Sequence, residues 1–306
     1  MDRFQEMQVF IAVAEQEGFA AAARQLRISP PSVTRAIAAM EERIGTQLLS
    51  RTTRNVHLTE AGQRYLEDCR RILGELDEAE EAAAGSYSVP CGYLTVTAPV
   101  LFGELYIAPL LTDYLDQFPA VQLNALLVDR VVNIADEGID VAIRIGHLQD
   151  NNQQAIKVGE VRQVICGAPA YFQRHGRPGH PTELSEANIV MSSASHLLSE
   201  WQFMDGSKPL SVRANPRLVV TANQAAINIA CLGWAVTRVL SYQVARQVVD
   251  GELEVVLRDY ELPALPIHVV YQKNNRIPAK VRTFVDFLAD RLRGDATLKA
   301  FGAGVG

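Results

Sequence analysis

The stretch Ser29–Arg51, SPPSVTRAIAAMEERIGTQLLSR, carries the signals of a single helix with a defined beginning and end. Ser29 can cap the first turn, and the proline that follows suits this turn because its missing N–H would have no partner there. Apolar residues recur at intervals of four, three and four and therefore line one face, namely Val33, Ile37, Met40 and Ile44. Gly45 then predicts the end of the helix, since glycine tolerates the positive φ of a helix stop.

The opposite face of this helix is small, polar and cationic near its N-terminus, where it presents Pro30, Pro31, Ser32, Thr34 and Arg35. Such a surface suits the DNA major groove, where the N-terminal residues of a recognition helix meet base edges. A second amphipathic helix at 19–26 precedes it after a short turn, as in a helix-turn-helix. This geometry alone leaves DNA binding and a plain helical bundle equally open, because apolar stripes usually mean only a core.

The residues after this helix predict a short β-hairpin, because Val56 and Leu58 alternate with polar side chains. Arg51 and Arg54 lie on the hairpin. A cationic hairpin beside a recognition helix is a wing that can reach phosphates or the minor groove. The alternative is an ordinary solvated turn.

A dense pattern of residues runs through the first sixty positions. It consists of Phe10, Gly18-Phe19-x-x-Ala22-Ala23-x-x-Leu26, Ser29-x-x-Ser32-Val33-Thr34-x-x-Ile37-x-x-Met40-Glu41-x-x-Ile44-Gly45-x-x-Leu48-Leu49-x-Arg51 and Leu58-Thr59-Glu60-Ala61-Gly62. The pattern resembles that of the LysR-type transcriptional regulators. Small departures from the family occur at Thr34, where serine is frequent, and at Leu49, where phenylalanine is frequent. The resemblance implies a winged helix-turn-helix domain over residues 1–58 that binds double-stranded DNA.

A long helix with a heptad seam is expected after Thr59, a residue that can cap it. The seam consists of residues separated by four, three, four and three, namely Tyr65, Cys69, Ile72, Leu76 and Ala79. Such a seam needs a partner surface. We therefore predict a dimerisation linker helix and hinge over residues 59–90, which would set the spacing of two recognition helices. The alternative is a helix packed on its own domain.

Beyond residue 90, strand-like segments alternate with helical ones, of which one is expected at 131–137. This alternation predicts a parallel sheet covered by helices. In the family that the sequence resembles, this region is a periplasmic-binding-protein-like α/β domain with two subdomains, between which the chain crosses twice. The expected effector-binding domain is 91–306, with subdomain I at 91–162 and 267–306 and subdomain II at 163–266. The predicted fold class is therefore α+β multidomain.

Ligands of open α/β sheets bind beyond the carboxyl ends of the strands, beside helix N-termini. The residues expected at such positions are Thr97, Ala98, Pro99, Val100, Arg144, Gly146, Thr221, Asn223 and Thr237. Their hydroxyls, backbone N–H groups and guanidinium suit a small carboxylate as effector. Thr97, Thr221 and Asn223 have a structural alternative, because such residues commonly cap helices, and Arg144 can instead pair with a structural carboxylate.

The composition, charge and cysteine spacing of the whole chain restrict the classes of protein to which the sequence can belong. Its 306 residues are 48% hydrophobic and 21% charged, as in soluble globular proteins. Neither a membrane-spanning run nor a secretory signal is found, so no membrane partner and a cytoplasmic location are expected. The net charge of −6 hides a local excess, because residues 24–54 contain six arginines against two glutamates. The four cysteines lack metal or redox spacing, and the distance in sequence from Cys166 to Cys231 argues against a peroxide-sensing pair.

No catalytic constellation is found: G-x-S-x-G, a P-loop, G-x-G-x-x-G after a strand and H-E-x-x-H are all missing from the sequence. We therefore expect no catalytic residues, no metal, no cofactor and no enzymatic activity. The favoured function is a transcriptional regulator whose activity changes when an effector binds between the two subdomains. Dimers would bind the operator, the resemblance implies tetramers, and RNA polymerase is a further partner if the protein is an activator. The alternative is a solute-binding protein of the periplasmic type without regulatory role.

Overall fold

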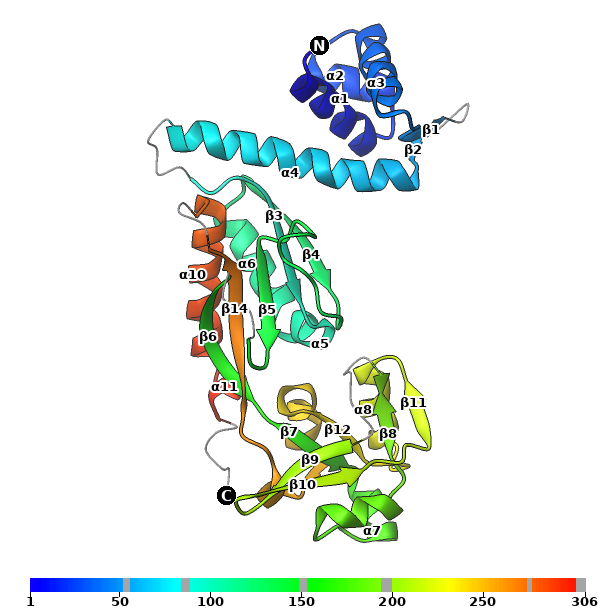
Figure 1. The fold of residues 1–306 in the computed structure, drawn as a ribbon, viewed down its shortest axis with the longest axis vertical. Coiled ribbons are helices and arrows are strands. Elements are labelled where there is room, and N and C mark those ends of the chain that lie inside the picture. Colours follow the sequence, from blue (N-terminus) through cyan, green and yellow to red (C-terminus); the bar gives the residue numbers. More distant parts are fainter. Residues whose placement is uncertain (52–55, 84–88, 149–152, 194–199, 274–276, 301–306) are drawn as a thin grey trace. The chain divides into compact units, whose positions relative to one another are not determined.

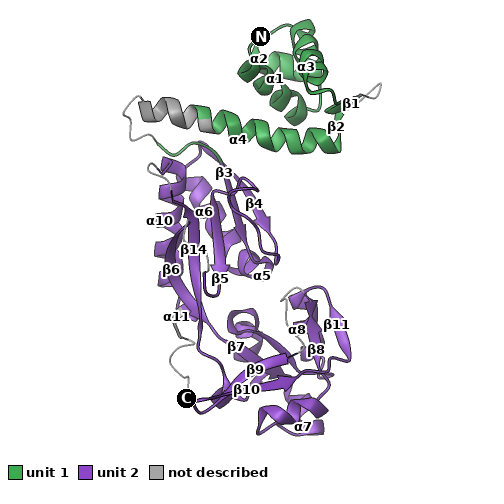
Figure 2. Cartoon of the chain, in the orientation of Figure 1, with its two compact units in different colours: residues 1–93 green, residues 94–306 purple. Residues whose placement is uncertain are grey.

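The computed structural model describes residues 1–306 except 52–55, 84–88, 149–152, 194–199, 274–276 and 301–306 (Figure 1). The side chains of residues 51, 75, 77–83, 299 and 300 are likewise not described. The chain divides into two compact units, Met1–Tyr93 and Leu94–Gly306 (Figure 2). Among the described helices, none combines the length and apolar character needed to cross a membrane.

The first unit is a small helical domain with a β-hairpin and a long final helix. Its elements are α1 (Arg3–Glu15), α2 (Phe19–Leu26), α3 (Pro30–Ile44), β1 (Leu49–Arg51), β2 (Val56–Leu58) and α4 (Glu60–Ala83). The signals of α3 are confirmed, because the side chain of Ser29 accepts a hydrogen bond from the N–H of Ser32 and Gly45 follows the helix with a φ of 76°. The predicted hairpin is confirmed by the antiparallel pairing of β1 with β2.

The core of this unit lies between the helices and contains the fully buried Phe10, Ile37 and Met40. One residue of the predicted apolar stripe differs, because Ile44 is 37% exposed. It is the last residue of α3, so the packed helices no longer cover it. The core holds the inner face of α3 and leaves its outer face to solvent.

Subdomain I, our name for the part of the second unit around its largest sheet, contains five strands in the order β4-β3-β5-β14-β6. These are β3 (Gly92–Ala98), β4 (Val121–Leu127), β5 (Val141–Ile145), β6 (Gln153–Val161) and β14 (Leu265–Gln272). The helical elements around it are α5 (Val100–Phe102), the π-helical η1 (Gly103–Ile107), α6 (Ala108–Gln117), α10 (Ala279–Gly294) and α11 (Thr297–Ala300). The ring of Tyr114 on α6 packs edge-on against that of Phe284 on α10, with 4.9 Å between centroids.

Subdomain II, our name for the rest of the second unit, is made of smaller sheets. Its elements are β7 (Gln163–Gly167), α7 (Pro169–His175), η2 (Pro181–Glu186), β8 (Val190–Ser192), β9 (Glu200–Asp205), β10 (Lys208–Arg213), β11 (Leu218–Val220), α8 (Asn223–Cys231), β12 (Thr237–Leu240), η4 (Ser241–Val244), α9 (Ala245–Val249), β13 (Glu254–Val256) and η5 (Arg258–Tyr260). Strand β7 pairs with β12 and β13, β8 with β11, and β9 with β10. The chain enters this subdomain between β6 and β7 and returns in β14 (Figure 1). Arg162 is the residue between β6 and β7, and η5 precedes the return.

The expectation of a parallel sheet is wrong. Strand β3 runs parallel to β5, but β14 runs antiparallel to both β5 and β6. The reason is topological, because β14 is the segment that returns from subdomain II and so enters the sheet from the opposite end to β3 and β5. The sheet is therefore mixed.

The expected helix at 131–137 is also wrong, since residues 134–138 form turns. The backbone N–H of Asn133 donates to Glu137 Oε1 at 3.0 Å, and Asn133 Oδ1 accepts from the N–H of Ala135 at 3.1 Å. Such local bonds from side chains compete with the helical ladder for the same backbone groups.

Candidate DNA-binding surface and ligand site

The N-terminal turns of α3 present the residues that were predicted to read DNA. Pro30, Pro31, Thr34 and Arg35 are exposed, and Ser32 is half-buried. On the same helix, the side chains of Val33 and Ile37 have no exposed surface. Burial of the inner face therefore fixes which side chains point outward, and these polar residues form one continuous outer face.

Arg35 has the longest side chain of this face. Its Nη2 lies 3.4 Å from Ser32 Oγ, and its Nε lies 3.4 Å from the carbonyl oxygen of Pro31. Both distances are long for N–H···O hydrogen bonds, so the guanidinium can leave its helix at little cost. The short hydroxyls are held close, with 2.8 Å between the Oγ atoms of Ser29 and Ser32.

Two residues that the sequence analysis did not single out for a role position this surface. The carboxylate of Glu41 accepts hydrogen bonds from the backbone N–H groups of Leu48, at 2.8 Å, and Leu49, at 3.0 Å, which ties α3 to the first strand of the hairpin. At Gly62 in α4, an added Cβ would lie 2.0 Å from the carbonyl oxygen of Leu48, so only glycine permits this close approach. Both belong to the family pattern, which is the signal that could have identified them.

Of the two arginines predicted for the wing, the structure describes the backbone of one, Arg51. Arg51 ends β1 and pairs with Val56 of β2. The side chain of Arg51 and the whole of Arg54 lie outside the described residues. The roles of these two arginines therefore stay predictions.

The first part of the predicted dimerisation seam packs on its own domain. Cys69 is fully buried, the ring of Tyr65 lies 5.6 Å from that of Phe10 in α1, and Ile72 packs against the same core. This packing is that of the alternative, a helix packed on its own domain, and the role of these three residues in dimerisation stays a prediction. Leu76 lies further along α4 and is half-buried, and the side chain of Ala79 lies outside the described residues.

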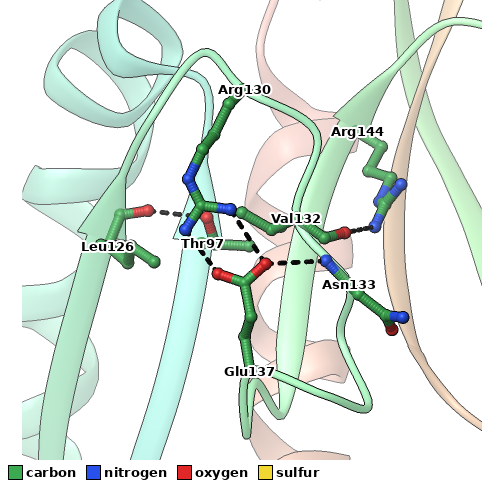
Figure 3. Close-up of polar contacts among 7 residues, drawn as sticks. All are labelled: Thr97, Leu126, Arg130, Val132, Asn133, Glu137 and Arg144. Carbon is green, nitrogen blue, oxygen red and sulfur yellow. Dashed lines mark hydrogen bonds and ion pairs between the residues drawn. The ribbon is translucent and has the colours of Figure 1, made fainter. Parts of the chain in front are cut away.

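At the end of β3, the groups expected to contact a ligand are bonded within the chain (Figure 3). Thr97 is buried, and its Oγ1 donates to the carbonyl oxygen of Leu126 at 2.7 Å. The backbone N–H of Val100 donates to Asp129 Oδ1 at 3.0 Å. Ala98 is buried and Pro99 is half-buried. Thr97 is therefore a strand–strand contact rather than a helix cap.

Arg144 supports the loop that connects β4 with β5 (Figure 3). Its Nη2 donates to the carbonyl oxygen of Val132 at 2.6 Å. The partner in this bond is a backbone carbonyl and not the structural carboxylate that was the alternative. In the same loop, hydrogen bonds from Arg130 and from the backbone N–H of Asn133 lower the pKa of Glu137 to about 2. Gly146 follows β5 with a φ of 118°, a conformation that favours glycine.

In subdomain II, the predicted residues divide between two ends of α8. Thr221 is exposed and Asn223 is buried, and both lie at its N-terminus, where Ala222 has no side chain that can cap the helix. Thr237 instead follows the C-terminus of α8. The expectation that it ends a strand is wrong, because it begins β12. It is 1% exposed, and its Oγ1 has no hydrogen-bond partner among the described residues.

The two cysteines of the second unit are closer than their separation in sequence suggests. Cys166 in β7 and Cys231 at the end of α8 belong to one hydrophobic core. Burial, with a smaller contribution from Cys231, raises the pKa of Cys166 to about 12, and burial also raises the pKa of Cys231. Distance in sequence was therefore a poor argument against a reactive pair, and the burial of Cys166, which favours its protonated thiol, is the better one. The described residues contain no group of metal-binding side chains.

Comparison with known proteins identifies the family to which this architecture belongs. The family model "LysR substrate binding domain" matches residues 88–293, and "Bacterial regulatory helix-turn-helix protein, lysR family" matches residues 4–63. An HTH-type transcriptional regulator of Xanthomonas campestris is 36% identical over 94% of this chain and 85% of its own. The HTH-type transcriptional activator AaeR of Escherichia coli is 29% identical over 95% of this chain and 94% of its own.

Solved structures agree with this match. The LysR-type regulator CrgA of Neisseria meningitidis is 26% identical, with a TM-score of 0.61 over 94% of this chain and 98% of that one. Full-length AphB of Vibrio cholerae, 23% identical with a TM-score of 0.61 over 94% of this chain and 99% of that one, has the same fold. The relatives are regulators rather than plain solute-binding proteins, which removes the alternative function. The chain belongs to the LysR family of transcriptional regulators, with a helix-turn-helix that binds DNA and a C-terminal effector-binding domain.

Proposed function

We propose that this regulator binds a partly palindromic operator as a dimer or as a pair of dimers, with the outer face of α3 in the major groove of each half-site. The observation that carries this proposal is the exposed face of Ser32, Thr34 and Arg35 on a helix whose inner face is fully packed. A helix held in this way presents its side chains without first having to order them. Arg51 and Arg54 of the wing would contact the DNA backbone.

Pairing of two chains follows from the charge of the DNA-binding unit. Six arginines against two glutamates over residues 24–54 support only a few phosphate contacts from one copy. Two copies on one operator double these contacts and read two half-sites. We propose that the later part of α4, including Leu76, contacts the second copy. The site of action would be the cytoplasm, where the DNA is, and an activator would also contact RNA polymerase.

The proposed effector is a small molecule, best a carboxylate, that binds between the subdomains. The N–H of Val100 already donates to Asp129. The acidic effector would therefore bind at the N-terminus of α8, beside Thr221 and Asn223. The backbone N–H groups and dipole of a helix start attract an anion. A cationic effector would instead favour the Asp129 side. The proposed function requires no catalysis and no cofactor.

The test is a gel shift with the full-length protein and DNA from upstream of its own gene, against random DNA of equal length. We expect a discrete complex that survives excess random competitor, and a footprint with two half-sites. Equal affinity for both DNAs would contradict the proposal. Arg64→Ala is a matched control, because Arg64 is an exposed arginine of α4 rather than of α3 and pairs with Glu60 at 3.0 Å.

A further inference from the structure

A cluster of three aromatic rings joins the two subdomains. Phe102 ends α5, Tyr106 lies in η1, and Tyr242 lies in η4 of subdomain II. The Tyr242 ring meets both others edge-on, with centroid distances of 5.3 Å to Phe102 and 5.9 Å to Tyr106, and the latter two rings stack at 4.9 Å. Phe102 and Tyr242 are buried. The contact is therefore dry, and one hydrophobic core runs through it from one subdomain to the other.

The subdomain I side of this cluster adjoins a predicted ligand position. Helix α5 begins at Val100, whose N–H is bound by Asp129, and it continues directly into η1. A π-helical turn places an extra residue in the helix and is frequent at functional sites. Burial raises the pKa of Tyr242, and the nearby carboxylate of Asp129 adds to this rise. Because Val100 begins the short helix that ends at Phe102, a shift of Val100 would move the Phe102 ring.

The subdomain II side of the cluster adjoins the crossover. Ser241, the neighbour of Tyr242, holds both backbone groups of Arg162, the residue between β6 and β7. The N–H of Arg162 donates to Ser241 Oγ at 3.1 Å, and the N–H of Ser241 donates to the carbonyl oxygen of Arg162 at 2.8 Å. Arg162 Nη1 also pairs at 2.8 Å with Glu261, on the segment that returns to β14. Both crossovers are thus tied to η4.

We propose that Ser241 and Tyr242 are positioning residues that couple the α5–η1 segment to the crossover at Arg162. Two successive residues of one short 3₁₀ turn move together, because their peptide link is planar and their backbone is hydrogen-bonded on both sides. A ligand bound between the subdomains that changes the position of α5 relative to subdomain II would displace Tyr242, and Ser241 would transmit the displacement to Arg162. The inference rests on the proposed function for the ligand, whereas the coupling itself exists in the ligand-free protein.

The alternative is that the rings only fill the core. The two cases differ in how far a change at Phe102 reaches. Phe102 packs on Tyr242 and Arg162 is bonded to Ser241, so a coupled η4 makes Arg162 respond to a change at Phe102. Plain packing would restrict the effect of a ring substitution to the neighbours of that ring.

The experiment is amide hydrogen exchange with single-residue resolution at Arg162, in the full-length, ligand-free protein. Ser241→Ala removes the acceptor of the Arg162 N–H and should speed its exchange about fivefold, the effect of losing one net hydrogen bond. Phe102→Leu should speed the same amide by a smaller factor of about two to three, because it loosens the Tyr242 ring. In a Tyr242→Leu background, Phe102→Leu should add nothing.

Phe118→Leu is the matched control, because Phe118 is a half-buried phenylalanine of subdomain I whose ring packs against that of Tyr114, with 4.8 Å between centroids. It should leave Arg162 unchanged. The proposal is overturned if Phe102→Leu speeds exchange within residues 100–108 but not at Arg162, or if its effect persists unchanged without Tyr242. Should Phe102→Leu unfold the domain, the half-buried Tyr106→Leu replaces it with the same expected result. A failed gel shift would affect the proposed function alone, since no DNA or ligand enters this measurement.

Discussion

The backbone N–H of Val100 donates a 3.0 Å hydrogen bond to the carboxylate of Asp129, which follows the C-terminal end of the neighbouring strand β4. The backbone N–H at the start of the helical stretch after β3 is therefore already hydrogen-bonded to a carboxylate of the chain itself. A second carboxylate would meet an occupied N–H and a like charge there. This relationship moves the expected position of an acidic effector from subdomain I to the N-terminus of α8.

The Asp129 contact can be tested through stability. Asp129→Ala leaves the N–H of Val100 without its partner and should cost about 0.5–2 kcal/mol of the free energy of unfolding, as the loss of a helix cap does. Asp129→Asn keeps an acceptor oxygen and should cost less. Urea denaturation of the full-length protein measures both. A wild-type midpoint for Asp129→Ala would show that the bond does not stabilise the fold.

Base readout by Arg35 is the second prediction. Arg35→Ala should lose about 1–3 kcal/mol of binding free energy on the operator and much less on random DNA, since a contact to a base edge exists only on the right sequence. Equal losses on both DNAs would make Arg35 a phosphate contact. Arg43→Ala is the control on the same helix, because Arg43 pairs with Glu6 of α1 and should change stability slightly rather than specificity.

The packing of α4 distinguishes two residues of the predicted dimerisation seam, Ile72 and Leu76. Ile72 belongs to the core of its own domain, so Ile72→Glu should destabilise the monomer. Leu76→Glu places a charge beyond that core and should weaken dimers and tight operator binding while the thermal midpoint of the domain stays near that of the wild type. Sedimentation velocity measures the assembly. A Leu76→Glu protein that sediments as the wild type does would rule out this part of α4 as the contact between copies.

Two threonines of the predicted ligand site should now behave differently. Thr97→Val leaves the carbonyl oxygen of Leu126 without its 2.7 Å partner and should cost about 1–3 kcal/mol of stability. Thr221 is exposed, so Thr221→Val should leave stability and operator affinity intact but blunt the response to an inducer. Promoter output is measured against inducer concentration, after a screen of small carboxylates. An unchanged dose response would remove Thr221 from the site.

Arg144→Ala should disturb the loop at Val132, whether or not an effector binds nearby, because it removes the donor to the Val132 carbonyl oxygen.

The buried thiols give a chemical prediction. Burial raises the pKa of Cys69 to about 11 and that of Cys166 to about 12, so both remain protonated at pH 7–8. Since the thiolate is the nucleophile, native protein should show little alkylation by iodoacetamide at these two positions, and urea should restore it. Peptide mass spectrometry locates the label. Rapid labelling of Cys166 in the folded state would contradict its burial.

The elements that could be predicted are those with local signals. The limits of α3 follow from Ser29 and Gly45, and α10 from its amphipathic period after Pro278, because caps and periodicity act between neighbours in the sequence. Strands such as β6, with the half-polar sequence QQAIKVGEV, carry no such signal. Their pairing is decided by β14, more than a hundred residues later in the chain.

The sequence by itself determined the family, the recognition helix and the order of its domains, since each depends on short patterns. Only the tertiary structure decided which polar groups are already satisfied: the N–H of Val100 by Asp129, the hydroxyl of Thr97 by Leu126, and the crossover at Arg162 by Ser241. These partners lie about thirty to eighty residues apart, where spacing holds no information about contact. A candidate binding residue becomes available or occupied only when the path of the chain brings a donor to an acceptor.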